Sequence, residues 1–373
     1  MKLFVLSDAS SIHTCRWVTS LSQRGCDILL FSLLKCDLTP YESLPNVQVY
    51  SCDFQVDSTS HFSQRLADKF IYLRALRQIR KQLRHFRPDL LHAHYASSFG
   101  LLGALSSYHP FLLSLWGSDV YIYPRAGKLY ESLLRFTLRR ADRLLSTSHC
   151  MAREAARYTD KPMLITPFGV DLQRFHPEPH TTRPNTFVVG NVKALRACYG
   201  IDVLIRAFSL VCQRNPQLDT QLLIAGVGPD KEMLEQLCSN LHIADKVRFL
   251  GYIPNEQLPQ LYSSFDVAVS LSHSESFGVV AVEAMSCGCP VVTSDADGFC
   301  EVVEHGVTGF VVPKADLEAA ADALQRFIDN PQLRDTMGAA GRARVEKLYD
   351  WEKNVDTMME VYNSMLNSSY HKR

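Results

Sequence analysis

The 373-residue sequence predicts an α/β protein built from two parallel-sheet domains. Two observations predict this class. Short apolar runs of strand length alternate with helical patterns along the whole chain, and a polar, proline-rich stretch divides that pattern into two halves. The length also favours two or three domains over one. We therefore expect two Rossmann-like domains facing a central cleft, with ligands at the carboxyl ends of the strands.

The elements can be placed in order. Strands of the first half are expected at residues 3–7, 27–33, 47–52, 90–93, 112–115 and 143–147, with helices at 12–24 and 66–86. Strands of the second half are expected at 186–190, 221–225, 247–250, 267–270, 290–293 and 309–312. Pro177, Pro179 and Pro184 mark the joint, so we expect the first domain at residues 1–175 and the second at 176–355.

Composition excludes several classes of protein. The eleven cysteines show no paired framework, and no signal-peptide pattern precedes the first strand, so we expect a reducing cytoplasm. Cys287 and Cys289 have no second cysteine pair or histidine pair at ligand spacing, so we expect no metal site. No apolar run approaches the roughly 18 residues of a membrane-spanning helix.

Charge is distributed unevenly although the net charge is zero. Residues 1–174 hold 22 Lys and Arg against 14 Asp and Glu, a net charge of +8, and residues 175–373 hold 17 against 25, a net charge of −8. A basic half joined to an acidic half indicates that one of them meets an anionic surface or substrate.

One segment carries most of the functional information. Residues 275–283 read Glu-Ser-Phe-Gly-Val-Val-Ala-Val-Glu, after an expected strand and at the start of an expected helix. Free amides at a helix N-terminus attract a diphosphate, and a glycine there lets the ligand approach closely. The first glutamate can reach sugar hydroxyls and the second a ribose diol; alternatively, both are solvated surface residues. The residues expected around the ligand are Glu275, Ser276, Phe277, Gly278, Val279 and Glu283.

This segment resembles the E-x7-E signature of the family 4 retaining GT-B glycosyltransferases, including its continuation Glu-Ala-Met-x-Cys-Gly-x-Pro-Val-Val at residues 283–292. The resemblance extends to residues 167–177, 200–208, 223–229, 247–251 and 301–309. It implies the GT-B fold, a nucleotide-sugar donor held by the second domain, and a base pocket near Gly251 and Tyr252. It also implies that a C-terminal helix at 356–373 can pack back on the first domain.

The sequence departs from the family where two cations usually grip the diphosphate. Lys193 can serve as the first cation, since lysine is a competent phosphate partner. The second position falls at or near Cys198, which carries no positive charge, and Arg196 is the candidate substitute. The alternative for both Lys193 and Arg196 is a solvated loop.

The first domain supplies the expected acceptor side of the cleft. The run at residues 7–17 resembles a subgroup with Ser-x-His-Thr-x-Arg-Trp, which places Ser10, Ser11 and His13 toward the cleft. Relatives often have His-Gly-x-Asp where this chain has Trp116 to Asp119. Asp119 is expected to bind the acceptor or steady the developing sugar charge, or else to cap a turn. His94 follows a strand that points into the same cleft, where a structural role is the alternative.

The resemblance implies a metal-independent transfer that retains the anomeric configuration, with Glu275 and Asp119 as the catalytic candidates. Amides of the helix and Lys193 would stabilise the leaving diphosphate. No cofactor is expected, because the nucleotide-sugar, most often a UDP-sugar in this family, is a substrate. No nucleophile–base constellation of the Ser-His-Asp type is readable.

A basic helix at residues 66–86 bears on the acceptor. Its apolar stripe is expected at Leu66, Phe70, Leu73, Leu76, Leu83 and Phe86, and its cations are Arg74, Arg77, Arg80, Lys81, Arg84 and Arg87. Arg135, Arg139, Arg140 and Arg143 add a second cluster. The helix either packs on the core with a solvated basic face or contacts the inner face of a membrane. The charge favours a glycan or lipid-linked acceptor, and no recognition motif for nucleic acid accompanies it.

Three other functions compete with this one. A nucleotide-sugar 2-epimerase or a phosphorylase uses the same two domains but lacks the segment at 275–283. A dinucleotide oxidoreductase would need Gly-x-Gly-x-x-Gly, which the run at 226–229 does not complete. A non-catalytic nucleotide-sugar-binding partner stays open because the second cation is missing.

Overall fold

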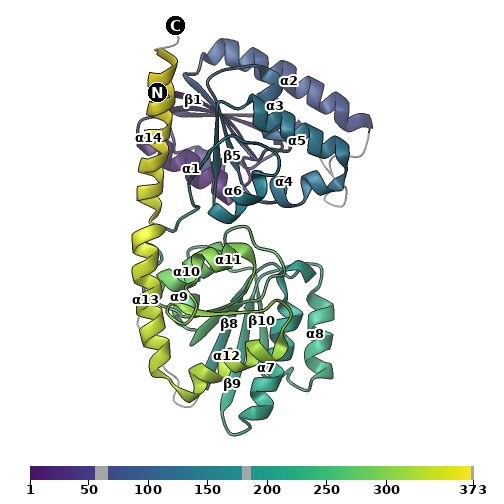
Figure 1. The fold of residues 1–373 in the computed structure, drawn as a ribbon, viewed down its shortest axis with the longest axis vertical. Helices are drawn as coiled ribbons and strands as arrows, with labels where there is room; N and C mark the ends of the chain where they lie inside the picture. Colours follow the sequence, from purple (N-terminus) through teal and green to yellow (C-terminus); the bar gives the residue numbers. More distant parts are fainter. Residues whose placement is uncertain (55–65, 179–185, 371–373) are drawn as a thin grey trace. The chain divides into compact units, whose positions relative to one another are not determined.

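The computed structural model describes residues 1–54, 66–178 and 186–370, and the chain forms two compact units. Unit 1 comprises Met1–Pro167 and Asn354–Arg373, and unit 2 comprises Phe168–Lys353. Each unit contains its own parallel sheet and its own hydrophobic core. The predicted fold class, two Rossmann-like domains of the GT-B type, is confirmed in both units (Figure 1).

The sheet of unit 1 has seven parallel strands in the order β3-β2-β1-β4-β5-β6-β7. They are β1 (Lys2–Leu6), β2 (Asp27–Leu34), β3 (Val47–Phe54), β4 (Leu90–His94), β5 (Phe111–Leu115), β6 (Arg143–Ser146) and β7 (Met163–Ile165). Five of the strands from β1 to β6 were expected within one residue at each end, and β3 runs two residues further than expected. The short β7, whose pattern is only three residues long, was missed.

Helices connect these strands: α1 (Ile12–Gln23), α2 (Leu66–Phe86), α3 (Phe99–Ser106), α4 (Ser118–Tyr121), α5 (Lys128–Arg140) and α6 (His149–Ala155). The expected apolar stripe of α2 is wrong at Leu73, which is 58% exposed. Leu83 is buried as expected, and Leu76 and Phe86 are partly buried against the core. Ala75 and Ile79, which were not expected, are also buried, at the i and i+4 positions of the face that Leu83 continues at i+8. The side chains of Leu66 and Phe70 lie outside the described residues.

The sheet of unit 2 has six parallel strands in the order β10-β9-β8-β11-β12-β13. They are β8 (Thr186–Val192), β9 (Asp219–Ala225), β10 (Val247–Gly251), β11 (Val267–Ser270), β12 (Val291–Ser294) and β13 (Gly309–Val312). The strand order reverses between β8 and β11, as it does between β1 and β4 in unit 1. Loops that follow strands at such a switch point diverge, which leaves room for a ligand.

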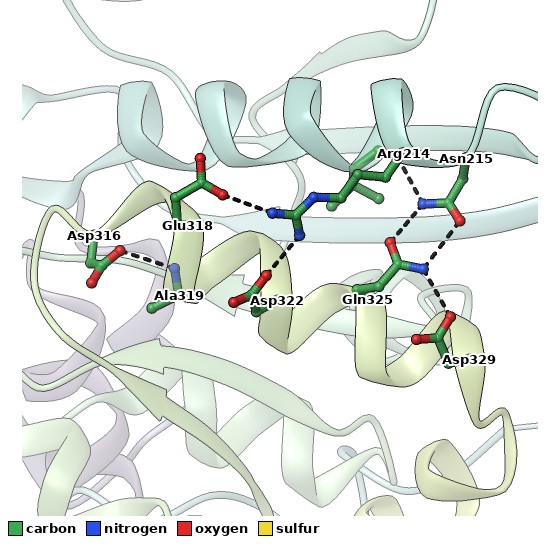
Figure 2. Close-up of polar contacts among 9 residues, drawn as sticks. Arg214, Asn215, Asp316, Glu318, Ala319, Asp322, Gln325 and Asp329 are labelled. Carbon is green, nitrogen blue, oxygen red and sulfur yellow. Dashed lines mark hydrogen bonds and ion pairs between the residues drawn. The ribbon is translucent and has the colours of Figure 1, made fainter.

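The helices of unit 2 are α7 (Ile201–Arg214), α8 (Lys231–Asn240), α9 (Leu258–Ser263), α10 (Val279–Ser286), α11 (Asp297–Val302), α12 (Leu317–Asp329) and α13 (Gln332–Leu348). Helices α7 and α12 lie side by side (Figure 1). Their exposed seam is polar: Arg214 contacts Glu318 and Asp322, and Asn215 and Gln325 exchange amide hydrogen bonds (Figure 2). This seam holds two helices together away from the switch point.

The unit boundary falls at Pro167, earlier than the expected residue 175. The amide of Val170 donates to the Tyr349 carbonyl at 2.7 Å, and the amide of Trp351 donates back to Val170 at 3.0 Å. These bonds attach the connecting segment to unit 2 before the proline-rich stretch begins. Pro179 and Pro184, on which the expected boundary rested, lie outside the described residues.

Helix α14 (Trp351–Tyr370) begins in unit 2 and continues in unit 1. Within unit 1, the Tyr362 hydroxyl lies 2.8 Å from Nδ1 of His92, and Arg24 pairs with Asp356 at 2.9 Å. Arg143 donates to the Ser364 hydroxyl at 2.8 Å. The last part of the chain is therefore an integral element of unit 1.

Candidate functional site

The carboxyl edge of the unit 2 sheet brings together two of the charged residues that the sequence singled out. Lys193 follows β8, and its ammonium lies 2.7 Å from Oε2 of Glu275, in the loop after β11. Both side chains are only 14% exposed, and the ammonium also lies 4.6 Å from the centre of the Tyr199 ring. The pair is neutral as a whole. An ammonium has three N–H donors, however, so Lys193 can donate to Glu275 and to an incoming anion at the same time.

The loop from Glu275 to Gly278 leads into α10 with its helix N-terminus at this edge. Gly278 has φ of +101°, and a Cβ there would come 2.7 Å from the Phe299 ring, so only glycine fits. The first amides of a helix have no partner within it and carry partial positive charge. Phe277 is buried edge-on against Phe168 and Tyr349, so its side chain anchors the loop. Ser276 and Val279, on either side, are half-buried.

Glu283 lies one turn into α10 and is half-buried. The hydroxyl of Tyr262, on α9, donates to its Oε2 at 2.9 Å. Burial first, and then the Glu283 charge, raise the pKa of the Tyr262 phenol well above its usual value. The phenol therefore stays protonated and remains a donor. Sequence reasoning missed Tyr262, because its partner lies 21 residues away on the next helix and no local spacing links the two.

The loops after β8, β9 and β10 meet beside Lys193. The Lys193 amide donates to the Ala225 carbonyl at 2.9 Å, and the Gly226 amide donates to the Gly251 carbonyl at 2.7 Å. A Cβ on Gly226 would lie 2.0 Å from the Lys193 carbonyl oxygen, so this approach requires glycine. Tyr252, the next residue after Gly251, is 72% exposed. Its ring is thus available on the surface of unit 2 near the edge where Lys193 lies.

The loop that departs from the family pattern, which contains Arg196 and Cys198, is held by a backbone hydrogen bond. The Cys198 carbonyl accepts from the His273 amide at 3.0 Å, which links it to the loop after β11. Arg196 is exposed, and its guanidinium has no ion pair within the part of the chain that the structure describes. A diphosphate role for Arg196 stays a prediction.

In unit 1, neutral polar groups occupy the corresponding edge. Nδ1 of His94, on β4, lies 3.0 Å from the Ser7 hydroxyl, which lies 2.6 Å from the Thr14 hydroxyl. The His94 ring stacks on Trp116 with centroids 4.4 Å apart, and His13 meets the same indole edge-on at 6.0 Å. Burial lowers the pKa of His94 well below its usual value, and burial and Arg16 lower that of His13 to about 4. Both imidazoles are neutral near pH 7.

Asp119 is fully buried at the start of α4. Its carboxylate accepts amide hydrogen bonds from Ala96 at 2.7 Å, Gly117 at 2.7 Å and Trp116 at 3.2 Å. Burial raises the pKa of this carboxyl, and the amide donors partly offset that rise. These contacts are those of the turn-capping alternative, since they organise the loops after β4 and β5. A catalytic role for Asp119 stays a prediction.

The residues expected at the start of α1 lie around that network. Ser11 precedes the helix, and the Ser10 amide donates to Oδ1 of Asp8 at 2.9 Å. Ser10 is exposed, whereas Ser11 and His13 are half-buried. Their side chains are accessible at the edge of unit 1, and their role stays a prediction.

Within residues 1–54, 66–178 and 186–370, no three His, Cys, Asp or Glu side chains are grouped so as to hold a metal ion. None of the helices in these ranges has the length and hydropathy needed to cross a bilayer.

Comparison with known families matches both halves of the chain. The family model described as glycosyl transferases group 1 matches residues 173–344, and the one described as glycosyl transferase 4-like matches residues 2–148. The first of these ranges lies within unit 2 and the second lies within unit 1.

Named relatives are similar over most of the chain. The D-inositol 3-phosphate glycosyltransferase of Streptomyces scabiei is 30% identical over 76% of this chain and 69% of its own length. The N-acetyl-alpha-D-glucosaminyl L-malate synthase of Bacillus anthracis is 26% identical over 74% and 75%. For the D-inositol 3-phosphate glycosyltransferase of Streptomyces griseus, which is 33% identical, the match spans 62% of this chain but only 55% of that protein.

Solved structures share the fold. Sucrose-phosphate synthase from Thermosynechococcus elongatus superposes with a TM-score of 0.85 at 22% identity, over 99% of this chain and 100% of the other. HepE of Anabaena, in complex with UDP and glucose, superposes with a TM-score of 0.77 at 20% identity, over 98% and 100%.

Proposed function

This chain belongs to the group 1 glycosyl transferases of the family 4 GT-B type, and we propose that it transfers a sugar from a nucleotide-sugar donor to an acceptor. One observation carries the proposal: Lys193, Glu275 and the N-terminus of α10 converge at the switch point of unit 2. Positive charge at such an edge suits a diphosphate.

Different residues of unit 2 bind different parts of the donor. Lys193 and the first amides of α10 bind the diphosphate and stabilise the charge that develops when its bond to the sugar breaks. Glu275, beside them, accepts from sugar hydroxyls, and Glu283 accepts from the ribose. Because cationic and amide groups of the chain supply this positive charge, we propose that transfer needs no metal. Retention of the anomeric configuration is proposed from the resemblance to the family 4 enzymes.

UDP is the carrier that we propose. It is supported by the HepE structure, in which UDP and glucose are bound to the same fold. The names of the relatives describe small hydroxylated acceptors. We do not carry those acceptors over to this chain, because it spans only 55% of the length of one of these relatives. We propose a glycan or lipid-linked acceptor, whose hydroxyls would meet the neutral imidazole network of unit 1.

The basic face of α2 supports a peripheral contact with anionic lipid at the inner face of a membrane. Within residues 1–54, 66–178 and 186–370, none of the exposed cations on or next to this helix has an ion pair with a carboxylate. They are Arg74, Arg77, Arg80, Lys81 and Arg84 on α2, and Arg87 just after it. Each Lys or Arg near anionic lipid contributes about 1 kcal/mol. Co-sedimentation with phosphatidylglycerol vesicles, but not with phosphatidylcholine vesicles, is expected, and Arg74→Glu with Arg77→Glu should abolish it.

Thermal stabilisation by a panel of UDP-, GDP-, ADP- and dTDP-sugars tests the donor proposal. We expect one nucleotide class to raise the melting temperature of the chain, and Glu283→Ala to remove the shift. Proton NMR of the reaction in EDTA then reports the anomeric configuration of the product. No shift with any of the four classes would refute the proposal.

The same experiment separates the competing functions. A melting shift without sugar transfer to any glycan or lipid-linked acceptor would favour the non-catalytic binding partner. Conversion of the nucleotide-sugar itself in the absence of an acceptor would favour a 2-epimerase.

A further inference from the structure

The contact between α9 and α10 points to a positioning residue of the donor site. Tyr262 is 1% exposed, and its ring is enclosed by Phe175 and Phe265, with ring centroids 6.4 Å and 6.1 Å away. Its hydroxyl lies 2.9 Å from Oε2 of Glu283. A buried polar atom is thus aimed from the interior at a side chain that lies partly on the surface.

We propose that Tyr262 holds Glu283 in the orientation that binds the ribose of the nucleotide, so that the phenol sets the affinity for ribonucleotides without touching them. The inference rests on the proposed function, because it assigns the ribose to Glu283. It adds a second residue, on a different helix, that controls how Glu283 is presented.

The geometry fits positioning rather than catalysis. A glutamate has three rotatable bonds, and a fixed donor on one oxygen selects one of its orientations before the ligand arrives. A carboxylate offers about four acceptor directions, and the bond from Tyr262 occupies one of them.

The electrostatics agree with this arrangement. Because burial and the Glu283 charge raise the pKa of the phenol well above its usual value, Tyr262 stays protonated near neutral pH and does not repel the carboxylate. The thiol of Cys287, at the end of α10, also has its pKa raised, to about 12, by burial and by the same glutamate. This thiol therefore also stays protonated near neutral pH.

Tyr262→Phe is the test, since it removes one oxygen and keeps the enclosed ring. We expect the dissociation constant for UDP, measured by calorimetry, to rise about tenfold, because a hydrogen bond to a charged group is lost. The KM for the UDP-sugar should rise similarly, with kcat within about twofold. If GDP or ADP binds and UDP does not, the same measurements are made with the nucleotide that binds.

The readout that a merely structural role would not move is ribose discrimination. The wild-type chain should prefer UDP to 2′,3′-dideoxy-UDP, and Tyr262→Phe should reduce that preference about as much as it weakens UDP. In a Glu283→Ala background, Tyr262→Phe should have no further effect.

A matched control is available in unit 1. Tyr362 is also fully buried and its hydroxyl is also bonded, to Nδ1 of His92. Tyr362→Phe makes the same chemical change within unit 1 and should leave UDP affinity unchanged.

The outcomes separate the two proposals. If Glu283→Ala weakens UDP and removes ribose discrimination while Tyr262→Phe does neither, the positioning role of Tyr262 is wrong and the proposed function stands. If Tyr262→Phe weakens UDP and dideoxy-UDP equally, its role is structural and the inference also fails. If no nucleotide binds the wild-type chain, or Glu283→Ala has no effect on any of them, the assignment of the ribose to Glu283 fails first.

Discussion

The carboxyl edges of the two sheets are built from the same topology but from different chemistry. In unit 2, the loops after β8 and β11 present an ion pair, Lys193 with Glu275, that is partly open to water. In unit 1, the loops and ends of β1, β4 and β5 present imidazoles and hydroxyls that bond to one another in the interior. Both edges lie at a switch point in strand order.

The difference shows how one fold prepares for two kinds of ligand. An ion pair of low exposure can exchange partners, because its charges are compensated but its ammonium still has donors to spare. A buried network of neutral groups is costly to disturb, because each broken bond leaves an unsatisfied polar atom. The edge of unit 2 is therefore suited to a charged ligand, and that of unit 1 is a rigid frame for a neutral one.

The largest expected effect comes from removing the exchangeable charge. Lys193→Ala leaves Glu275 as an uncompensated carboxylate at the place where the diphosphate binds. We expect kcat/KM for the nucleotide-sugar to fall about 100-fold or more, the range seen when one donor to a developing charge is lost.

Steady-state kinetics with Lys231→Ala as the control would check this. Lys231 is also in unit 2, but it is exposed and its ammonium lies 3.5 Å from a carboxylate oxygen of Glu235 in a surface pair. A change of less than threefold for Lys193→Ala would remove the contrast between the two edges.

The next effect concerns the frame of unit 1. Asp119→Asn replaces one of the two carboxyl oxygens that accept three backbone amides with an NH2 group, which then faces N–H donors. We expect about 2–3 kcal/mol of stability to be lost in unit 1, as for a buried acceptor of this kind. Hydrogen exchange of the intact chain resolves this by strand, so β4 and β5 should lose protection while β8 and β11 keep it.

A carboxylate of the other unit provides the control. Asp316 also caps a helix, and its Oδ1 accepts from the Ala319 amide at 2.9 Å, but it is exposed (Figure 2). Asp316→Asn should cost no more than about 1 kcal/mol. Equal losses for the two variants would mean that burial adds nothing to the role of Asp119.

Acid should weaken unit 1 through its histidines. Burial lowers the pKa of His92 to about 3, whereas an unfolded histidine titrates near 6.5. Above about pH 6.5, His92 is unprotonated in both the folded and the unfolded state, so its titration costs unit 1 no stability. As pH falls toward 3, the unfolded state binds a proton that the folded state does not, which costs about 1.4 kcal/mol per pH unit.

Hydrogen exchange between pH 7 and pH 5 gives the measurement. His92→Gln keeps polar groups near Ser114 and Tyr362 but cannot titrate, so its deficit relative to the wild-type chain should shrink as pH falls. A deficit that stays constant across this range would contradict the lowered pKa.

The sequence predicted the fold and the charged edge better than the neutral one. Strand positions follow from buried apolar runs, and Glu275 and Glu283 lie in a segment whose glycine and helix start are local signals. Asp119, by contrast, bonds to amides from two loops, and Tyr262 reaches Glu283 from a neighbouring helix. Such contacts depend on tertiary packing, which spacing along the chain does not encode. The prediction that Leu73 is buried was wrong for a related reason. The apolar residues of this helix are compatible with more than one buried face, and only tertiary packing selects among them.

The smallest effect is expected where charge is abundant but solvated. Arg214 of α7 pairs with Glu318 at 2.7 Å and with Asp322 at 2.8 Å, and its two partners are 67% and 68% exposed (Figure 2). Exposed pairs of this kind contribute only about 0–1 kcal/mol, because water solvates the separated ions nearly as well. Arg214→Ala should therefore lower the stability of unit 2 by less than about 1 kcal/mol, and by less still at 1 M salt. Denaturant titration at low and high salt measures both values. A loss comparable to that of Asp119→Asn would show that this seam is coupled to the core of unit 2. The number of polar contacts, rather than their burial, would then decide how much a cluster of them stabilises its unit.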